Sequence, residues 1–448
     1  MKTNKAMMMK LKKLACLLCC CIGFSAIARA QTAPPLLTLK EAVEIALKNN
    51  YNIILAKNNK IIAQNNVTPG AAGILPAVGA TLTQNNSNQH IEQTRSDGSV
   101  NKIPSAKNSS LSFGPSLNWT IFDGFGMFAN YDQLKQLNEL STVTAHDTVL
   151  NTTTDVILTY YDLINQYEQI KAQHGAIAIS HTQLKYANDK YSVGTASHLD
   201  VYNAQVNLNT DTAALLNLLA HFKSTKIRLN QMLVRDPQTD FSVTDTIIVD
   251  DKLVLGDILS SAQIQNPAII SAQINKRIAD INLRQVQSTR YPVVSLGAGY
   301  TWSHNRTPAG FTRTQDANGL NYGLTASINI FDGFNQNRRE RNAKIQIDNA
   351  AIGIKKTRLN VESQISNLYV SYLSGLDLVK LGQSNVAIAK RNLDISLDKY
   401  KIGTITPLEI REAQRNYLDA QSTFFAAQYQ SKVAEVTLKQ ITNNLNIQ

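Results

Sequence analysis

The sequence predicts a mainly α-helical fold with β-hairpins, built by tandem duplication of one unit. Three observations predict it. Short motifs recur at one constant spacing, two segments alternate apolar and small polar residues, and two proline-free segments carry apolar residues every seven positions. Alternation with a period of two is typical of half-buried strands, and a sustained seven-residue repeat is typical of coiled-coil helices.

The N-terminal segment has the pattern of a secretory signal peptide. Five lysines precede an apolar stretch from Leu14 to about Phe24, and the sequence Ala28–Arg29–Ala30 supplies a small-x-small cleavage site. We therefore expect residues 1–30 to be removed. The alternative of an N-terminal anchor is disfavoured because the apolar stretch is too short to span a bilayer. All four cysteines (Cys16, Cys19, Cys20 and Cys21) lie in this segment, so residues 31–448 hold no disulfide, and these leader cysteines match a lipidation site poorly.

The charge of the chain excludes some classes of partner. The formal net charge is +11, but residues 1–30 hold six basic and no acidic residues, so residues 31–448 carry +5. This balance and the absence of a basic stripe argue against nucleic-acid binding. Residues 31–448 also contain no apolar run of 18 or more residues, so an exported protein of this kind is soluble, secreted or inserted into a membrane as strands.

An internal repeat organises the chain. The motif IFDGF occurs at 121–125 and 330–334, and KYSVGT at 190–195 matches KYKIGT at 399–404, both at an offset of 209. Upstream of IFDGF the offset is 216, as in Pro76 and Pro292, so the stretch between this proline and IFDGF is seven residues longer in the first copy than in the second. We predict a first repeat over 31–240, an inter-repeat segment over 241–252 and a second repeat over 253–448.

Each repeat is predicted to contain one β-hairpin, at about 76–122 and 292–331. Leu117, Trp119 and Ile121 alternate with small polar residues in the first copy, and Leu324, Ala326, Ile328 and Ile330 do so in the second. The Asn- and Ser-rich segments 84–110 and 304–319 are predicted to be solvated loops between the strands. In the inter-repeat segment, 241–249 alternates weakly and predicts a short strand.

Long helices follow each hairpin. The segments 127–190 and 335–399 contain no proline, and apolar residues recur every seventh position from Val156 to Tyr191 and from Ile365 to Tyr400. Each segment of about 64 residues would form a rod roughly 96 Å long. Shorter helices are predicted at 39–72 and 197–234, and two of them placed end to end would match one long helix.

The hairpins cannot close a membrane sheet within one chain. Two hairpins give four strands, and an edge exposed to lipid would leave backbone amides unsatisfied. Three chains would supply twelve strands for a closed β-barrel and twelve helical columns around a tunnel, an α-barrel. Trp119, Tyr300 and Trp302 would then lie at the lipid interface, whereas in a two-sheet sandwich the same aromatics would belong to the core.

With these features the sequence resembles the TolC-like outer-membrane efflux proteins, over essentially all of residues 31–448. The resemblance rests on the duplicated unit, on FDGF at each strand-to-helix crossing and on YxxGT at each helical reversal. It implies a homotrimeric channel of the outer membrane with a long periplasmic extension, part of a tripartite efflux or type I secretion system. Its partners would be a periplasmic adaptor and, through it, an inner-membrane transporter.

The resemblance also assigns residues. It implies adaptor contact for the two tip turns, at Tyr191, Val193, Gly194, Thr195, Tyr400, Ile402, Gly403 and Thr404. It places Asp394 near the periplasmic constriction, where we expect either a polar gate or a solvated helix face. The crossings are formed by Phe122, Asp123 and Gly124 in the first copy and by Phe331, Asp332 and Gly333 in the second.

No catalytic constellation is visible in the sequence, so we predict neither an enzyme nor a cofactor. His174 and His181 lie seven residues apart on one helix, about 10.5 Å along the axis, which is too far for them to share a metal ion. Two other classes remain as alternatives. A trimeric coiled-coil adhesin would explain the heptads but not the duplicated hairpins, and a periplasmic hydrolase would need catalytic residues that we do not find.

Overall fold

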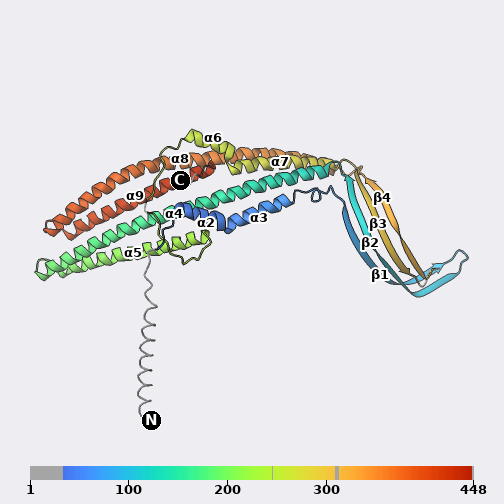
Figure 1. Cartoon of the computed structure of the whole chain (residues 1–448), viewed down its shortest axis with the longest axis horizontal. Helices are drawn as coiled ribbons and strands as arrows, with labels where there is room; N and C mark the ends of the chain where they lie inside the picture. The colour runs from blue at the N-terminus through green and yellow to red at the C-terminus, as the bar shows by residue number, and fades with distance from the viewer. Residues whose placement is uncertain (1–33, 245, 308–311, 446–448) are drawn as a thin grey trace, which may run out of the picture.

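The computed structural model describes residues 34–244, 246–307 and 312–445, so the predicted signal peptide and its cysteines lie outside the described residues. The molecule is a long bundle of helices with a curved sheet at one end (Figure 1). The helices are α2 (Leu39–Asn49), α3 (Tyr51–Asn65), α4 (Gly126–Ser192), α5 (His198–Met232), α6 (Leu255–Gln265), α7 (Pro267–Ser288), α8 (Asn335–Lys401) and α9 (Pro407–Ile441). Within the described residues, none of them is both long and apolar enough to cross a bilayer.

The helix boundaries follow the predicted duplication. The helices α4 and α8 have 67 residues each and are displaced by 209, as are α5 and α9. The helices α2 and α6 are displaced by 216 and have 11 residues each. The prediction of two long rods flanked by shorter helices is therefore confirmed, and the two copies share one helical framework.

The prediction of one continuous helix over 39–72 is wrong. Asn50 has an extended backbone (φ −61°, ψ 126°) that separates α2 from α3, and its side-chain oxygen accepts hydrogen bonds from the amides of Asn52 and Ile53. The Asn50 side chain also donates to the carbonyl of Met232 at 2.8 Å, which fastens the break to the end of α5. Asn266 repeats the arrangement between α6 and α7 with the carbonyl of Ile441. An asparagine cap therefore outweighs the helical periodicity on both sides of it.

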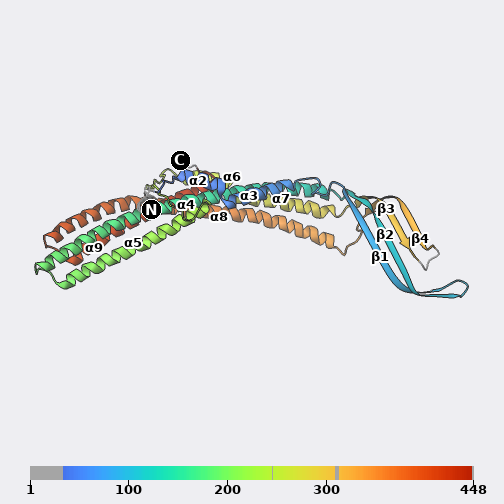
Figure 2. The same ribbon diagram turned by 60° about the horizontal axis from the view of Figure 1, so that its bottom comes forward.

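Four antiparallel strands form one sheet in chain order. They are β1 (Ala77–Thr94), β2 (Val100–Phe122), β3 (Val293–Arg306) and β4 (Thr314–Ser327). The sheet places β2 of the first copy beside β3 of the second, with Trp119 opposite Leu296. Strands β1 and β4 are its two edges, and the β1–β2 hairpin extends well beyond β3–β4 (Figure 2).

Three strand predictions need correction. The segment 84–110 is mostly strand, because Gln84 to Thr94 pair with Val100 to Leu111 and only a tight turn containing Gly98 remains. Likewise β3 reaches Arg306 and β4 begins at Thr314. Backbone pairing needs no apolar side chains, so polar strands can continue beyond the amphipathic part of a hairpin. At the other end β4 stops at Ser327, because its partner β3 begins at Val293 and offers no further pairing.

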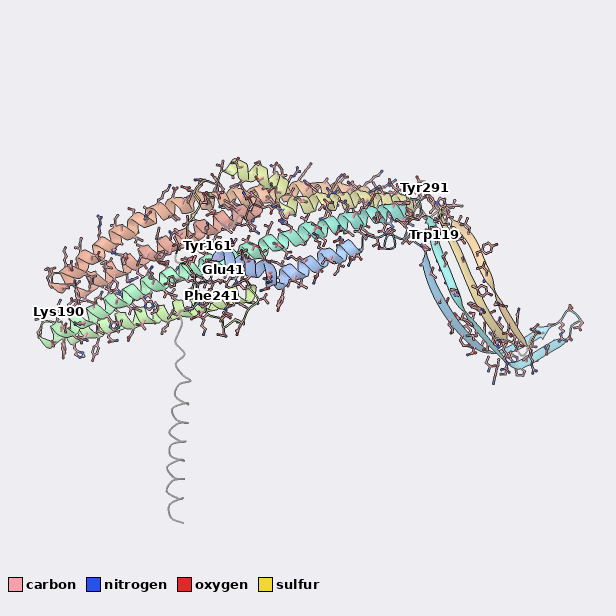
Figure 3. All side chains as sticks on the ribbon, in the orientation of Figure 1. Glu41, Trp119, Tyr161, Lys190, Phe241 and Tyr291 are labelled. Carbon is pink, nitrogen blue, oxygen red and sulfur yellow. The ribbon has the colours of Figure 1, made fainter. Side chains whose placement is uncertain are left out.

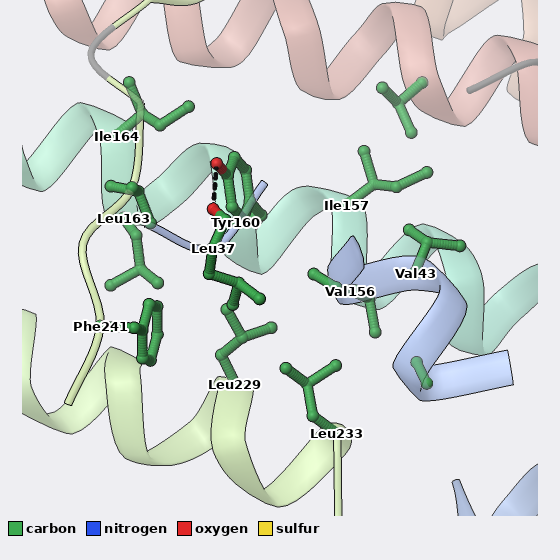
Figure 4. Close-up of a cluster of buried hydrophobic side chains, with 14 residues drawn as sticks. Leu37, Val43, Val156, Ile157, Tyr160, Leu163, Ile164, Leu229, Leu233 and Phe241 are labelled. Carbon is green, nitrogen blue, oxygen red and sulfur yellow. Dashed lines mark hydrogen bonds between the residues drawn. The ribbon is translucent and has the colours of Figure 1, made fainter. Parts of the chain in front are cut away.

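The predicted strand over 241–249 is reduced to one bridge. Ser242 pairs in parallel with Leu36, and the other described residues of this segment form neither helix nor strand. Phe241 and Val243 instead contribute to a core cluster with α2, α4 and α5, shown in Figure 4. In this cluster the buried hydroxyl of Tyr160 donates to the carbonyl of Leu37 at 2.8 Å. A second cluster joins α6, α7, α8 and α9, so each copy has its own core midway along the bundle.

Candidate functional site

The two tip turns reverse the chain at the end of the bundle farthest from the sheet, where Lys190 is labelled in Figure 3. Gly194 has φ +79° and Gly403 has φ +77°, a conformation that suits glycine. In each turn the glycine amide donates to the carbonyl three residues back, and the threonine amide donates to the carbonyl five residues back. This pair of hydrogen bonds is a Schellman-type helix end, which explains the GT of both motifs.

The next helix begins at once in both copies. Ser197 and Asp200 form a capping box before α5, and Thr406 and Glu409 form one before α9. The hydrogen bonds from Thr406 lower the pKa of the Glu409 carboxyl, so this cap is charged at neutral pH. Each tip is thus a rigid hairpin fixed by its own backbone and caps.

The two tips present different side chains. Tyr191 is 46 % exposed, whereas its counterpart Tyr400 is 3 % exposed and packs against Tyr186. Burial raises the pKa of the Tyr400 phenol, and the Lys190 amino group lies 4.7 Å from the centre of its ring. Val193 and Ile402 are exposed at the two turns. Tyr400 therefore holds the two tips together. The apolar side chains of the tips that remain accessible are Tyr191, Val193 and Ile402.

Asp394 lies exposed on α8. Among the ion pairs and hydrogen bonds found for residues 34–244, 246–307 and 312–445, none involves its carboxylate. Lys185, its counterpart on α4, is also exposed. Asp394 is therefore an exposed charge close to the tip, free to interact with groups outside this chain.

A buried polar cluster lies between α4, α5 and α9, and the sequence analysis did not single it out. It consists of Gln173, Ser180, Gln183, Asp211, Arg411 and Gln414. Arg411 binds the Asp211 carboxylate through both terminal nitrogens, at 2.7 and 2.8 Å, and the Ser180 hydroxyl donates to the same carboxylate. Gln414 donates to the carbonyl of Ala176 and accepts from Gln183.

This cluster fixes how the two copies pack near the tip. A buried ion pair needs good geometry and further hydrogen bonds to offset its desolvation, and all of these are present. Buried polar groups at one level of a helical bundle favour a single register of packing. Gln173 and Ser180, seven residues apart in a buried stripe, were the signal in the sequence. The heptad row identified in the sequence was instead the apolar row that contains Ile170. Between Ile170 and the tip this row becomes partly exposed, so the polar stripe beside it takes over the packing.

The strand-to-helix crossings hold two consecutive residues in left-handed conformations. Gly124 and Phe125 have φ of +70° and +68°, and Gly333 and Phe334 have +66° and +64°. For a bulky residue this conformation costs about 1–2 kcal/mol. A Cβ atom on Gly124 would lie 2.2 Å from the carbonyl oxygen of Ser288, whereas one on Gly333 would meet only Asn335 at 3.8 Å. The crossing of the first copy is therefore packed against α7, and that of the second copy is open.

The predicted interface aromatics occupy two levels of the sheet. Trp119 lies near the crossings and its indole donates to the carbonyl of Ile74 at 2.9 Å (Figure 3). Tyr300 and Trp302 lie two residues apart on β3, with ring centres 4.5 Å apart, and Phe113 stacks on Trp302. His174 and His181 are both exposed, and the described residues contain no group of His, Cys, Asp and Glu suited to a metal ion.

Comparison with known proteins assigns the chain to a family. The sequence profile described as outer membrane efflux protein matches residues 42–234 and 258–444, which is most of the chain and covers both repeats. The chain is 23 % identical over 411 residues to the outer membrane efflux protein BepC of Brucella suis, covering 91 % of this chain and 86 % of that protein. It is 21 % identical over 310 residues to the outer membrane protein TolC of Escherichia coli, covering 67 % of this chain and 62 % of TolC.

Solved structures share the fold. The crystal structure of the Campylobacter jejuni CmeC outer membrane channel superposes with a TM-score of 0.76 at 18 % identity, covering 91 % of this chain and 85 % of that chain. A membrane protein from Pseudomonas aeruginosa also gives a TM-score of 0.76, at 17 % identity and with 90 % of both chains covered.

Proposed function

We propose that this chain, which belongs to the outer membrane efflux protein family, forms a homotrimeric passive conduit of a tripartite efflux or type I secretion system. Membership of the family makes it an outer-membrane efflux channel with a periplasmic helical extension, not an enzyme, and excludes the alternatives of an adhesin and a hydrolase. The trimer, the adaptor and the individual site residues are the parts that need support from the molecule itself.

The observation that carries the proposal is an open row of helices. Toward the tip α5 packs on α4, α4 on α9 and α9 on α8, so α5 and α8 are the outer members (Figure 1). Both carry exposed apolar side chains at heptad spacing. We call Leu381, Ile388, Ile395 and Ile402 the outer row of α8, and Leu199, Tyr202, Val206 and Leu216 the outer row of α5; all eight are 57 to 75 % exposed.

The outer rows face away from the contacts within the chain. Ile395 follows the buried Leu393 by two residues, which is about 200° around the helix, and Val206 is related in the same way to the buried Ala204. A heptad row predicts a helical partner, because such a row buries its side chains in a second helix. No described helix of the same chain covers either row.

The two outer rows match each other in level. Counting from the tip, Leu199 corresponds to Ile402 and Val206 to Ile395, because α5 leaves the tip where α8 reaches it. An interface between α5 of one chain and α8 of a neighbouring chain is heterologous, and such interfaces form rings when the rotation closes. The row of helices would thereby lose both of its exposed edges.

The sheet supports the same closure. Its edge strands β1 and β4 leave backbone groups unpaired, which is costly in a membrane. Pairing β1 of one chain with β4 of a neighbouring chain would join the four-stranded sheets of three chains into one closed sheet of twelve strands. One rotation would then close the sheet and the helices together.

The tips support contact with an adaptor. Val193 and Ile402 are among the most exposed apolar residues, and rigid Schellman turns hold them at the end of the bundle. Exposed apolar groups on a rigid support are typical of a binding surface. We assign adaptor contact to Tyr191, Val193, Gly194, Thr195, Ile402, Gly403 and Thr404, and a role in packing the tip to Tyr400.

Variants of the tip test this function. Replacing Val193, which is exposed at the first tip and belongs to neither outer row, by Asp should leave a trimer in isolated outer membranes but raise the sensitivity of cells to exported toxic compounds toward that of a deletion strain. The matched control, His174→Asp, lies exposed on α4, away from the tip and outside both outer rows, and should export normally. If the Asp variant exports normally, adaptor contact at the tips is wrong; if the native mass in mild detergent is that of a monomer, the trimer is wrong.

Asp394 has its own test. As part of a polar gate, its carboxylate would raise the conductance for cations over anions, because a ring of acidic side chains attracts cations. Asp394→Ala should reduce that cation selectivity in planar bilayers, while Lys185→Ala should not. Unchanged conductance and selectivity in Asp394→Ala would leave only the solvated face.

A further inference from the structure

A groove lies where the strands meet the helices, close to Tyr291 in Figure 3. It has a volume of about 460 Å³ and is bordered by α4 of the first copy and by α7 and α8 of the second. Phe125, Phe128 and Tyr291 supply its aromatic lining, and its charged lining consists of Arg284, Arg290 and Glu340. We call it the crossing groove.

The aromatic side of the crossing groove is exposed at a conformational cost. Phe125 is 63 % exposed although its backbone is in the left-handed region, and Phe128 and Tyr291 are each 53 % exposed. The ring of Phe125 contacts the ring of Phe122 edge-on and the ring of Phe128 at a tilt. Three large rings exposed next to strands that belong in the outer membrane indicate an apolar environment at this level.

The polar side has hydrogen-bonding capacity to spare. Arg284 binds Asp132 through Nη1 at 3.2 Å, and its other nitrogens form none of the hydrogen bonds found in the described chain. Arg290 contacts Glu340 through Nε and donates to Asn337 through Nη2 at 2.8 Å, which leaves Nη1. Both arginine side chains are about half exposed. A guanidinium with free N–H groups is well suited to a phosphate.

Basic residues outnumber acidic ones in the two segments of the second copy that border the groove, although Asp132 and Asp332 pair with Arg284 and Arg339. The segments 284–291 and 335–344 contain six basic residues and one acidic residue, so they carry as much net positive charge as the whole of residues 31–448. The first copy lacks this feature, because Gly126 to Lys135 at the start of α4 hold one acidic and one basic residue. Only the second copy therefore presents a basic surface at the level of the crossings.

We propose that the crossing groove binds an anionic phospholipid of the periplasmic leaflet, with its phosphate at Arg284 and Arg290 and its acyl chains along Phe125, Phe128 and Tyr291. The inference rests on the sheet lying in the outer membrane, and it goes beyond the trimer and the adaptor. Clustered basic residues beside interfacial aromatics attract anionic headgroups and anchor among acyl chains at the same time.

Native mass spectrometry of the intact oligomer in mild detergent tests the proposal. The probes are phosphatidylglycerol, zwitterionic phosphatidylethanolamine and inorganic phosphate, each at the same concentration. Both lipids offer a phosphate to the arginines, but the ammonium group of phosphatidylethanolamine is repelled by the same guanidinium groups. We therefore expect phosphatidylglycerol to be retained roughly tenfold more than phosphatidylethanolamine. Equal retention of the two lipids would overturn the proposal. So would full displacement of phosphatidylglycerol by inorganic phosphate, because the groove would then be an anion site without a lipid.

Three variants separate the lipid site from a structural role. Arg284→Gln should lower retention of phosphatidylglycerol roughly tenfold. Asp132→Asn is the matched control, because it breaks the same ion pair but keeps the guanidinium, and it should retain at least as much lipid as the unaltered protein. Phe128→Ala should weaken lipid retention without changing the oligomer. If Asp132→Asn loses as much lipid as Arg284→Gln, the arginine acts through the ion pair and the proposal is wrong.

These outcomes are independent of the proposed assembly. A variant that is still trimeric and still exports but retains no phosphatidylglycerol preference supports the lipid site and leaves the conduit intact. If the unaltered protein is trimeric and shows no preference, the lipid site alone fails.

Discussion

The helices α4 and α8 are duplicates of each other in length and position but not in burial. Both have 67 residues and both begin after a phenylalanine in the left-handed conformation. Yet α4 buries 20 residues and α8 only eight. The reason is their place in the molecule, because α4 lies inside the row of helices and α8 at its edge. Duplication thus preserved the backbone, while the side chains diverged to suit different neighbours.

The difference indicates what is missing around α8. A helix of 67 residues with an apolar heptad row on its outer side needs a cover, and the row of α5 offers a matching one on the far side of the molecule. The helix α4 is thus covered by helices of its own chain, and we propose that α8 is covered by a helix of a neighbouring chain.

The largest expected effect breaks this cover. Replacing Ile388 and Ile395 together by Glu should abolish the trimer, because charged groups would have to be buried without partners. The single chain should still fold, since both positions are exposed within it. Native mass measures the result, and Lys390→Glu, which also adds a negative charge to the exposed surface of α8, should stay trimeric. A trimeric double variant would show that the outer row of α8 is not an interface.

The second effect concerns the buried ion pair between Arg411 and Asp211, which lies beside α4 near the tip and has no counterpart among the ion pairs found on α8. Arg411→Ala would leave the Asp211 carboxylate buried and unpaired, and we expect a loss of about 3–5 kcal/mol. Replacing both residues, as Arg411→Met with Asp211→Leu, should recover most of it. Chemical denaturation of the detergent-solubilised protein measures both. If Arg411→Ala is as stable as the unaltered protein, the cluster does not hold the two copies together.

The third effect compares the two crossings. Alanine at Gly333 should cost about 1–2 kcal/mol for the left-handed backbone alone. Alanine at Gly124 carries the same cost and adds a clash with the carbonyl of Ser288, worth about 1–3 kcal/mol more. Thermal unfolding should therefore rank Gly124→Ala below Gly333→Ala. Equal midpoints would mean that the first crossing is no more tightly packed than the second.

The smallest effect is a pH dependence of the inter-repeat segment. A hydrogen bond from Lys439 lowers the pKa of Asp250, which fastens this segment to α9. A carboxyl with a lowered pKa stabilises the fold above its unfolded pKa, near 3.9, and loses that contribution as the pH falls through the folded value. Thermal midpoints at pH 5 and pH 3 should therefore differ less for Asp250→Asn than for the unaltered protein. Asp348→Asn, an exposed carboxyl on α8, serves as the control and should leave the difference unchanged.

Much of the fold could be predicted from the sequence because its signals are local and repeated. The proline-free segments and the turn motifs predicted the bounds of α4, α8 and α5 to within a few residues, and the offset of 209 predicted that a fourth helix would follow α8. The helix breaks at Asn50 and Asn266 were not predicted, because the apolar period continues on both sides of each asparagine. The breaks are stabilised by hydrogen bonds from the two asparagine side chains to the ends of α5 and α9, which are distant in the sequence.

The sites were less predictable because they depend on neighbours far apart in the chain. Arg411 and Asp211 are 200 residues apart, and the sequence does not say that they meet. The crossing groove likewise joins Phe125 to Arg284 and Arg290 from the other copy. Tyr191 and Tyr400 occupy equivalent motif positions, yet one is exposed and the other is buried, because only the second packs against the opposite tip.

Cross-linking between copies tests the central claim most directly. Residues 31–448 contain no cysteine, so Val206→Cys and Ile395→Cys would introduce the only thiols in this part of the chain. If α5 of one copy packs on α8 of the next, mild oxidation of outer membranes should join this double variant into covalent trimers, whereas Val206→Cys with Lys390→Cys should remain monomeric on denaturing gels. A double variant that forms no covalent oligomer in intact membranes would contradict the trimeric arrangement.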